Sequence, residues 1–99
     1  MTDRDFPPIH PGEILHAEFL EPMGISQDRL ADDLGVPLRL VREVIQGAAS
    51  ISADTALRLG HYFSMEPQFW LNLQSRYDLI VAEQSLSARL AQEVRPRAA

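Results

Sequence analysis

Residues 37–46 contain two arginines, one glutamate and one glutamine, and these residue types can hydrogen bond to DNA. Arg39 and Arg42 could each bind a guanine edge or a phosphate, because a guanidinium donates two parallel hydrogen bonds. Gln46 could contact adenine or phosphate, and Leu38 could touch a thymine methyl group. The candidate DNA-binding residues are Gln27, Leu38, Arg39, Arg42, Glu43 and Gln46.

The same residues also have a purely structural interpretation. Arg39 and Glu43 are four residues apart, so on a solvated helix they could simply pair with each other, at roughly 0.2–0.5 kcal/mol. Elsewhere the sequence contains no Ser/His/Asp arrangement, glycine-rich phosphate loop or carboxylate pair with a plausible pocket. It therefore indicates a protein that is not an enzyme.

His10, Glu13 and His16 have the residue types and the three-residue spacing of a metal site. Pro11 and Gly12 follow His10 directly, however, and place it at or before the start of a helix. We therefore predict no metal and no other cofactor. His10 is expected to cap the helix, and His16 to lie on the surface.

Residues 26–47 predict two short amphipathic helices joined by a tight turn, the outline of a helix-turn-helix. Ser26 is a good N-cap, and Gln27 follows it at a helix start, where free N–H groups can meet phosphate. Gly35 suits the positive φ that ends a helix. The second helix, residues 37–46, would enter the major groove of DNA as a recognition helix.

The flanking sequence predicts further helices and no strands. A first helix is expected over residues 11–20, ended by Pro22 and Gly24, and later helices begin at the N-cap Ser52 and at Pro67. The predicted fold class is all-α, with five helices and possibly a sixth. The predicted divisions are an extended N-terminal arm at 1–9, a helix-turn-helix domain at 10–83 and a C-terminal segment at 84–99, a short helix or frayed tail.

The composition describes one small acidic domain. The 99 residues carry a net charge of −5, and no lysine is present. This balance counts against simple attraction to DNA, and Asp28, Asp32 and Asp33 would repel phosphate unless they face away. There is no Cys, no apolar run near the ~18 residues of a membrane span and no signal peptide. A cytoplasmic location is therefore expected.

The helix that begins at Pro67 carries an apolar stripe too long for its neighbours to cover. Its distal part could form the interface of a homodimer. A dimer would place two recognition helices about 34 Å apart, one turn of DNA, on a palindromic operator. The candidate interface residues are Tyr77, Ile80, Val81, Leu86 and Leu90.

The chain resembles the HigA-type antitoxins of bacterial toxin–antitoxin modules, within the XRE-like helix-turn-helix group. The resemblance covers about residues 6–84 and rests on four motifs: HPGEIL at 10–15, the helix-turn-helix at 26–47, ISADTALRLG at 51–60 and PQFWLNLQSRYDL at 67–79. HPGEIL combined with FWLNLQ is its most specific part.

This resemblance implies a lambda-repressor-like all-α fold and a homodimer that represses its own promoter by binding double-stranded operator DNA. By the same carry-over, the six candidate residues match DNA-facing positions. The resemblance also implies a protein partner, a small basic RelE-like HigB toxin that cuts mRNA. The acidic surface would bind and neutralise this toxin.

The sequence departs from the pattern of the family in two places. Position 37 is often Ser or Thr, the cap of the recognition helix, and here it is Pro. The residues after Gly47 are often basic, and here they are Ala48 and Ala49. Both changes weaken the expected grip on phosphate. A second hypothesis is therefore an orphan regulator, or a protein-interaction module that keeps the fold with weak or lost DNA binding.

Overall fold

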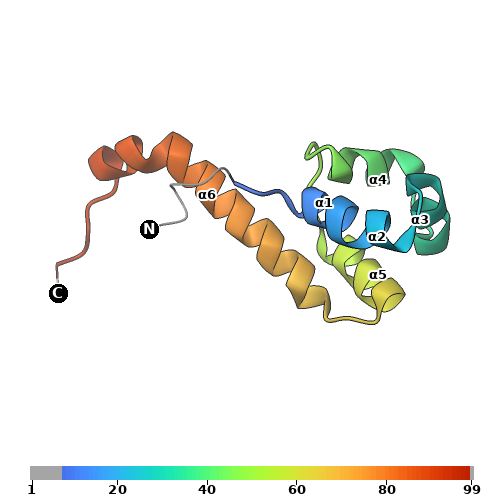
Figure 1. Cartoon of the computed structure of the whole chain (residues 1–99). Helices are drawn as coiled ribbons and strands as arrows, with labels where there is room; N and C mark the ends of the chain where they lie inside the picture. The colour runs from blue at the N-terminus through green and yellow to red at the C-terminus, as the bar shows by residue number, and fades with distance from the viewer. Residues whose placement is uncertain (1–7, 99) are drawn as a thin grey trace.

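The structure is a computed structural model that describes residues 8–98, and all regular secondary structure in this range is helical (Figure 1). The predicted all-α helix-turn-helix fold is confirmed. Of the predicted N-terminal arm, residues 1–7 lie outside the described residues, and Pro8 and Ile9 have no regular secondary structure. The helical elements are α1 (Pro11–Ile14), η2 (Leu15–Leu20), α2 (Glu21–Met23), α3 (Gln27–Leu34), α4 (Leu38–Ile45), α5 (Ala53–Phe63) and α6 (Pro67–Glu93).

The elements α1, η2 and α2 form one continuous first helix that runs past Pro22. The prediction that Pro22 helps to end this helix is therefore wrong. A proline interrupts the regular ladder of hydrogen bonds, and the chain accommodates it by widening to a π-helical turn in η2. In this turn the N–H of Glu21 donates to the carbonyl of His16, five residues back. Gly24, in the left-handed conformation with φ 66°, ends the helix.

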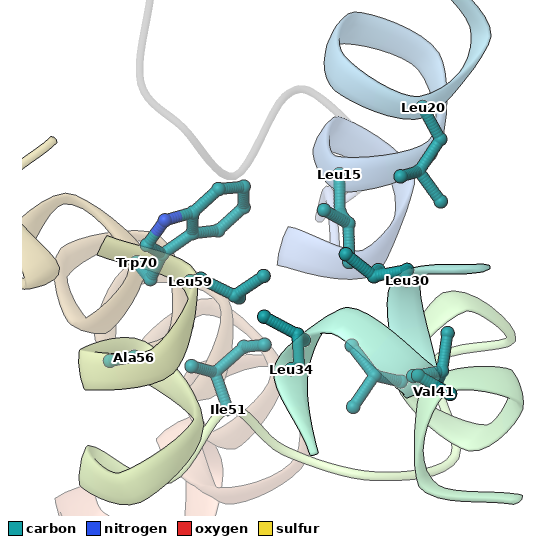
Figure 2. Packing of buried hydrophobic residues seen from close by; sticks show 11 residues of the cluster. Leu15, Leu20, Leu30, Leu34, Val41, Ile51, Ala56, Leu59 and Trp70 are labelled. Atoms are coloured by element: carbon teal, nitrogen blue, oxygen red, sulfur yellow. The ribbon is translucent and has the colours of Figure 1, made fainter. Parts of the chain in front are cut away.

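The core is one cluster of buried apolar side chains that come from η2, α3, α4, α5, α6 and the loop before α5 (Figure 2). Trp70 from α6, Leu30 from α3 and Leu59 from α5 are fully buried. The cluster consists of Leu15, Leu20, Leu30, Ala31, Leu34, Val41, Val44, Ile51, Ala56, Leu59 and Trp70. Because side chains from both α3 and α4 enter it, the core fixes the two helices of the predicted DNA-reading unit against the rest of the domain.

Glycines mark two places where backbone packs against backbone. A Cβ atom on Gly12 would lie only 1.9 Å from the carbonyl oxygen of Val44, so the start of the first helix packs directly on α4. A Cβ atom on Gly60, in the middle of α5, would lie 2.8 Å from the carbonyl oxygen of Met65. Gly60 therefore makes room for the turn before α6.

The helix α6 is a single element of 27 residues. The segment 84–99, expected as a short helix or a frayed tail, continues α6 without a break as far as Glu93. Figure 1 shows the C-terminal half of α6 leaving the helical bundle. Despite this length, no helix within residues 8–98 is apolar enough to cross a membrane.

A buried side chain holds α6 against the loop before α5. The Oε1 atom of Gln74 accepts a hydrogen bond of 2.7 Å from the backbone N–H of Ile51, and its Nε2 atom donates to Asp78. Gln74 is the glutamine of the FWLNLQ motif. The motif therefore contributes a buried aromatic residue, Trp70, and a buried polar tie, both of which support the fold.

Candidate nucleic-acid interface

The helix α3 begins and ends as its sequence predicts. The Oγ atom of Ser26 accepts a hydrogen bond of 3.0 Å from the N–H of Arg29, which satisfies one of the free donors at the helix start. At the other end, Gly35 adopts φ 71°, and the N–H of Val36 bonds back to Ala31 at 3.1 Å. This Schellman arrangement reverses the chain within a few residues.

Pro37 occupies the N-cap of α4, and its side chain offers no hydrogen bond to the first turn. Its backbone is extended, with ψ 142°, and its carbonyl accepts a 3.0 Å bond from the N–H of Leu40. The recognition helix therefore starts at Leu38 rather than Pro37, with Gln46 as its C-cap. Ser or Thr at position 37 would add a side-chain acceptor that this chain lacks.

The two sides of α4 differ sharply in polarity. Val41 and Val44 are buried in the core, and Ile45 packs beside them. At 3.6 residues per turn, the opposite side carries Arg39, Arg42, Glu43 and Gln46. Arg39, Arg42 and Gln46 are exposed and Glu43 is partly buried, so these four predicted residues share one outward-facing surface.

Leu38 does not join that surface. Its side chain is partly buried and packs against the core cluster. The reason is helical spacing: Leu38 precedes Val41 by three residues and Ile45 by seven, which puts all three on the same side. The prediction that Leu38 points outward is therefore wrong. Gln27 is the first residue of α3 and is partly buried.

The two arginines of α4 differ in their ion-pair partners. The Nε atom of Arg39 donates to Glu43 at 3.1 Å, although the Arg39 side chain is 86% exposed. The intrahelical pair that we considered as a structural alternative is therefore present. Arg42 forms no ion pair with any residue in the range 8–98. Its guanidinium is the one on this surface that can meet a phosphate or base without breaking an existing contact.

Asp33, one of the three aspartates of α3, is bound to neighbouring side chains. It accepts hydrogen bonds from the Tyr62 hydroxyl of α5 at 2.7 Å and from Arg29 at 3.0 Å. The hydrogen bond from Tyr62 and the charge of Arg29 lower the pKa of the Asp33 carboxyl. All three aspartates are exposed, but the negative charge of Asp33 is compensated by Arg29.

His10 joins the first helix to the loop after the recognition helix, a role that the sequence did not suggest. Its Nδ1 atom accepts a 2.9 Å hydrogen bond from the N–H of Gly12, so the predicted capping role is confirmed. The ring lies close to Gly47 and packs edge-on against Tyr77 of α6, with centroids 4.9 Å apart. His10 therefore connects the end of α4 to α6.

Burial lowers the pKa of His10 below its ordinary value of 6.5, although the carbonyl of Ala49 and the carboxylates of Asp78 and Glu13 favour the charged form. A lowered pKa means that the unfolded chain takes up the proton first as the pH falls. We therefore expect the contribution of His10 to stability to be complete above pH 6.5 and to decline as the pH drops below it.

The measurement is the urea unfolding midpoint at pH 7.5 and pH 5.0 for the natural chain and for His10→Asn, since Asn caps helices but does not titrate. The natural chain should lose more stability than the variant over this interval. Equal losses would show that His10 does not titrate in this window.

His16, Glu13 and His10 do not form a metal site. The Nε2 atom of His16 lies 2.9 Å from Glu21, a pairing across the π-helical turn, while the Nδ1 atom of His10 is engaged with Gly12. Across residues 8–98, no three His, Asp or Glu side chains come together in a way that could hold a metal ion. His16 is partly exposed, close to the predicted surface position.

No family model matches the sequence. The chain is 50% identical to virulence-associated protein I of Dichelobacter nodosus over 80 residues. The matched residues make up 81% of this chain and 74% of that protein. The chain is 42% identical over 72 residues to antitoxin HigA-1 of Vibrio cholerae, covering 73% of this chain and 68% of that protein.

The fold is also similar to that of the Pseudomonas aeruginosa antitoxin HigA, whose structure was solved with the higBA promoter. The two chains are 43% identical with a TM-score of 0.89, and the match covers 93% of this chain and all of the other. Identity of this extent over whole domains, together with the same arrangement of helices, establishes the relationship. The chain belongs to the HigA-type antitoxin family of XRE-like helix-turn-helix regulators.

Proposed function

We propose that the chain is a sequence-specific DNA-binding antitoxin that represses its own operon and neutralises a RelE-like, mRNA-cleaving HigB toxin by binding it. The outward surface of α4 supports the DNA-binding part most directly. It presents the guanidinium of Arg42, which forms no ion pair within residues 8–98, and an exposed amide, Gln46, on a helix whose opposite side is buried. A related antitoxin of the same fold was solved with its promoter, which also supports this part.

In this function the residues of the reading surface have distinct roles. Arg42 contacts a guanine edge or phosphate, Gln46 contacts adenine or phosphate, and Gln27 approaches phosphate from the start of α3. Arg39 takes part by exchanging its bond with Glu43 for one with DNA. Leu38, which packs inward, reaches a thymine methyl group only along its exposed edge.

Electrostatic attraction to the toxin follows from the distribution of charge. The helices from Pro11 to Leu34 contain six carboxylates and a single arginine, Arg29. Residues 35–98, which include α4, carry seven arginines and six carboxylates, so the acidic excess lies in the helices before α4. This separation leaves an acidic surface for a basic toxin beside a reading surface that is not acidic overall.

Arg42→Ala is expected to weaken binding to DNA from the chain's own promoter about 10- to 100-fold, the effect of losing one specific arginine contact. Titrations by fluorescence anisotropy at two salt concentrations measure it. If Arg42 binds a phosphate, its loss lowers the dependence of affinity on salt concentration by about one phosphate contact. If it binds a base, its loss relaxes the sequence preference at one position. Arg95→Ala, which removes the same charge beyond the end of α6, is the control and should bind normally.

Equal affinities for the Arg42 variant and the Arg95 control would contradict the reading role of α4. If the natural chain has no sequence preference even at low salt, the repressor function fails and the protein-interaction alternative stands. The toxin-binding part is tested separately, by co-purification with a short basic RelE-like protein encoded beside the chain. An orphan regulator binds DNA but has no such partner.

A further inference from the structure

Glu43 is a carboxylate that shares the outward side of α4 with Arg39 and Arg42. It lies in the last turn of α4, which ends at Ile45, and there the negative end of the helix dipole opposes a carboxylate. Its charge also repels the phosphates that this side of the helix would approach. A glutamate at this position therefore serves neither the stability of the helix nor general attraction to DNA.

The ion pair with Arg39 offsets little of this cost. The Nε atom of Arg39 lies 3.1 Å from Glu43, but the Arg39 side chain is 86% exposed and that of Glu43 is 39% exposed. The arginine precedes the glutamate by four residues, which is the weaker of the two orientations on a helix, and exposed pairs of this kind contribute little. DNA can therefore break the pair easily, and both side chains then become available to bases.

The turn after α4 holds Glu43 more firmly than Arg39. The carbonyl of Glu43 accepts hydrogen bonds from the N–H of Ala48 at 2.8 Å and from the N–H of Ala49 at 3.1 Å. These bonds fold the chain back onto the end of the helix beside Glu43. On this surface a carboxylate in a fixed position thus stands next to a guanidinium on a long, exposed side chain. The carboxylate determines which base can lie opposite it, while the guanidinium can adapt.

The base edges in the major groove differ in how well they fit a carboxylate. A carboxylate only accepts hydrogen bonds, so it fits the N4 amino group of cytosine and is repelled by the acceptors of guanine and thymine. Adenine presents its amino group beside the N7 acceptor, which a carboxylate cannot satisfy.

We propose that Glu43 is a specificity-determining residue of the reading surface. It accepts a hydrogen bond from a cytosine of the promoter, and it excludes DNA that places an acceptor at the same position. Arg39, released from the ion pair, then donates to a nearby guanine or phosphate. The inference rests on the proposed DNA-binding function, and it gives that function a residue that acts mainly by rejecting other sequences.

Glu43→Gln tests this role, because glutamine keeps the size of the side chain, loses the charge and can donate as well as accept. Fluorescence anisotropy measures binding to DNA from the chain's own promoter and to a shuffled fragment of the same length and composition. The variant should bind the shuffled DNA several-fold more tightly and the promoter no more tightly than the natural chain does. The ratio of the two affinities should therefore fall about 10-fold.

Glu93→Gln is the matched control, because Glu93 forms the same kind of pair with Arg89, at 3.3 Å and four residues apart. Figure 1 shows that this end of α6 lies far from α4. The control makes the same change in net charge and should leave the ratio unchanged. Glu43→Asp keeps the charge but shortens the side chain, so it should weaken binding to the promoter without strengthening binding to the shuffled DNA.

Replacing the base pairs of the promoter one at a time locates the contact. At one cytosine the replacement should weaken binding of the natural chain about 10-fold and have little effect on binding of the Glu43→Gln variant. Urea unfolding checks the fold of the variant, which should be at least as stable as the natural chain because a charge opposed to the helix dipole is removed.

Two results separate this inference from the proposed function. If Glu43→Gln leaves the affinity ratio unchanged, or if no base pair distinguishes it from the natural chain, Glu43 does not determine specificity and the proposed function still stands. If the natural chain binds promoter and shuffled DNA equally well, both are overturned.

Discussion

Gly12→Ala is expected to lower the free energy of unfolding by about 3 kcal/mol, at the upper end of the cost of overpacking. The added methyl group would lie 1.9 Å from the carbonyl oxygen of Val44, an atom of the α4 backbone. A flexible side chain could move aside, but here the first helix and the recognition helix must separate. Urea unfolding followed by circular dichroism measures the change.

Gly24→Ala is the matched control, because it is the same substitution in the same helix. Gly24 has no atom within 4 Å of an added Cβ, so only its left-handed backbone, φ 66°, opposes the change. This conformation costs roughly 1–2 kcal/mol for a residue other than glycine. If Gly12→Ala destabilised the chain no more than Gly24→Ala, the close contact between α1 and α4 would be disproved.

Trp70→Ala is expected to cost about 3–5 kcal/mol, which is a large part of the 5–15 kcal/mol typical of a whole domain. Trp70 is fully buried and contacts Phe19 and Phe69, with ring centroids 5.1 Å away in each case. Its removal leaves a large cavity between the first helix and α6. The same unfolding measurement should show a much lower urea midpoint.

Trp70→Phe distinguishes packing from hydrogen bonding. The indole Nε1 atom is buried and has no hydrogen-bond partner among the described residues. Phenylalanine therefore removes an unsatisfied donor while retaining most of the aromatic volume, and its cost should be well below that of alanine. An equally large loss for both variants would show that the indole nitrogen makes an essential contact.

Local signals in the sequence were sufficient to predict how the helices begin and end. Ser26, Gly35 and Ser52 perform the capping roles expected of them, because a cap depends on one residue and its nearest neighbours. The inward side of α4, with Val41 and Val44, followed from helical spacing alone. These are short-range effects, which the types of neighbouring residues and the 3.6-residue spacing of the helix describe well.

Contacts between distant residues could not be predicted in this way. Gly12 meets Val44, and Gln74 meets Ile51, across separations that no local pattern encodes. The outward side of α4 also could not be predicted completely from local patterns. Helical spacing allowed Arg39 either to face DNA or to pair with Glu43, and only the geometry shows that the pair forms in the free protein.

The separation between the two sides of α4 has a consequence for evolution and engineering. The inward residues and the backbone contact with Gly12 hold the helix against the core, while the side chains of Arg42 and Gln46 form no hydrogen bond or ion pair with another residue of the range 8–98. After gene duplication, copies can thus diverge at these outward positions without a penalty in folding. A library randomised there should yield mutually insulated repressors, each matched to a different promoter, on one unchanged scaffold.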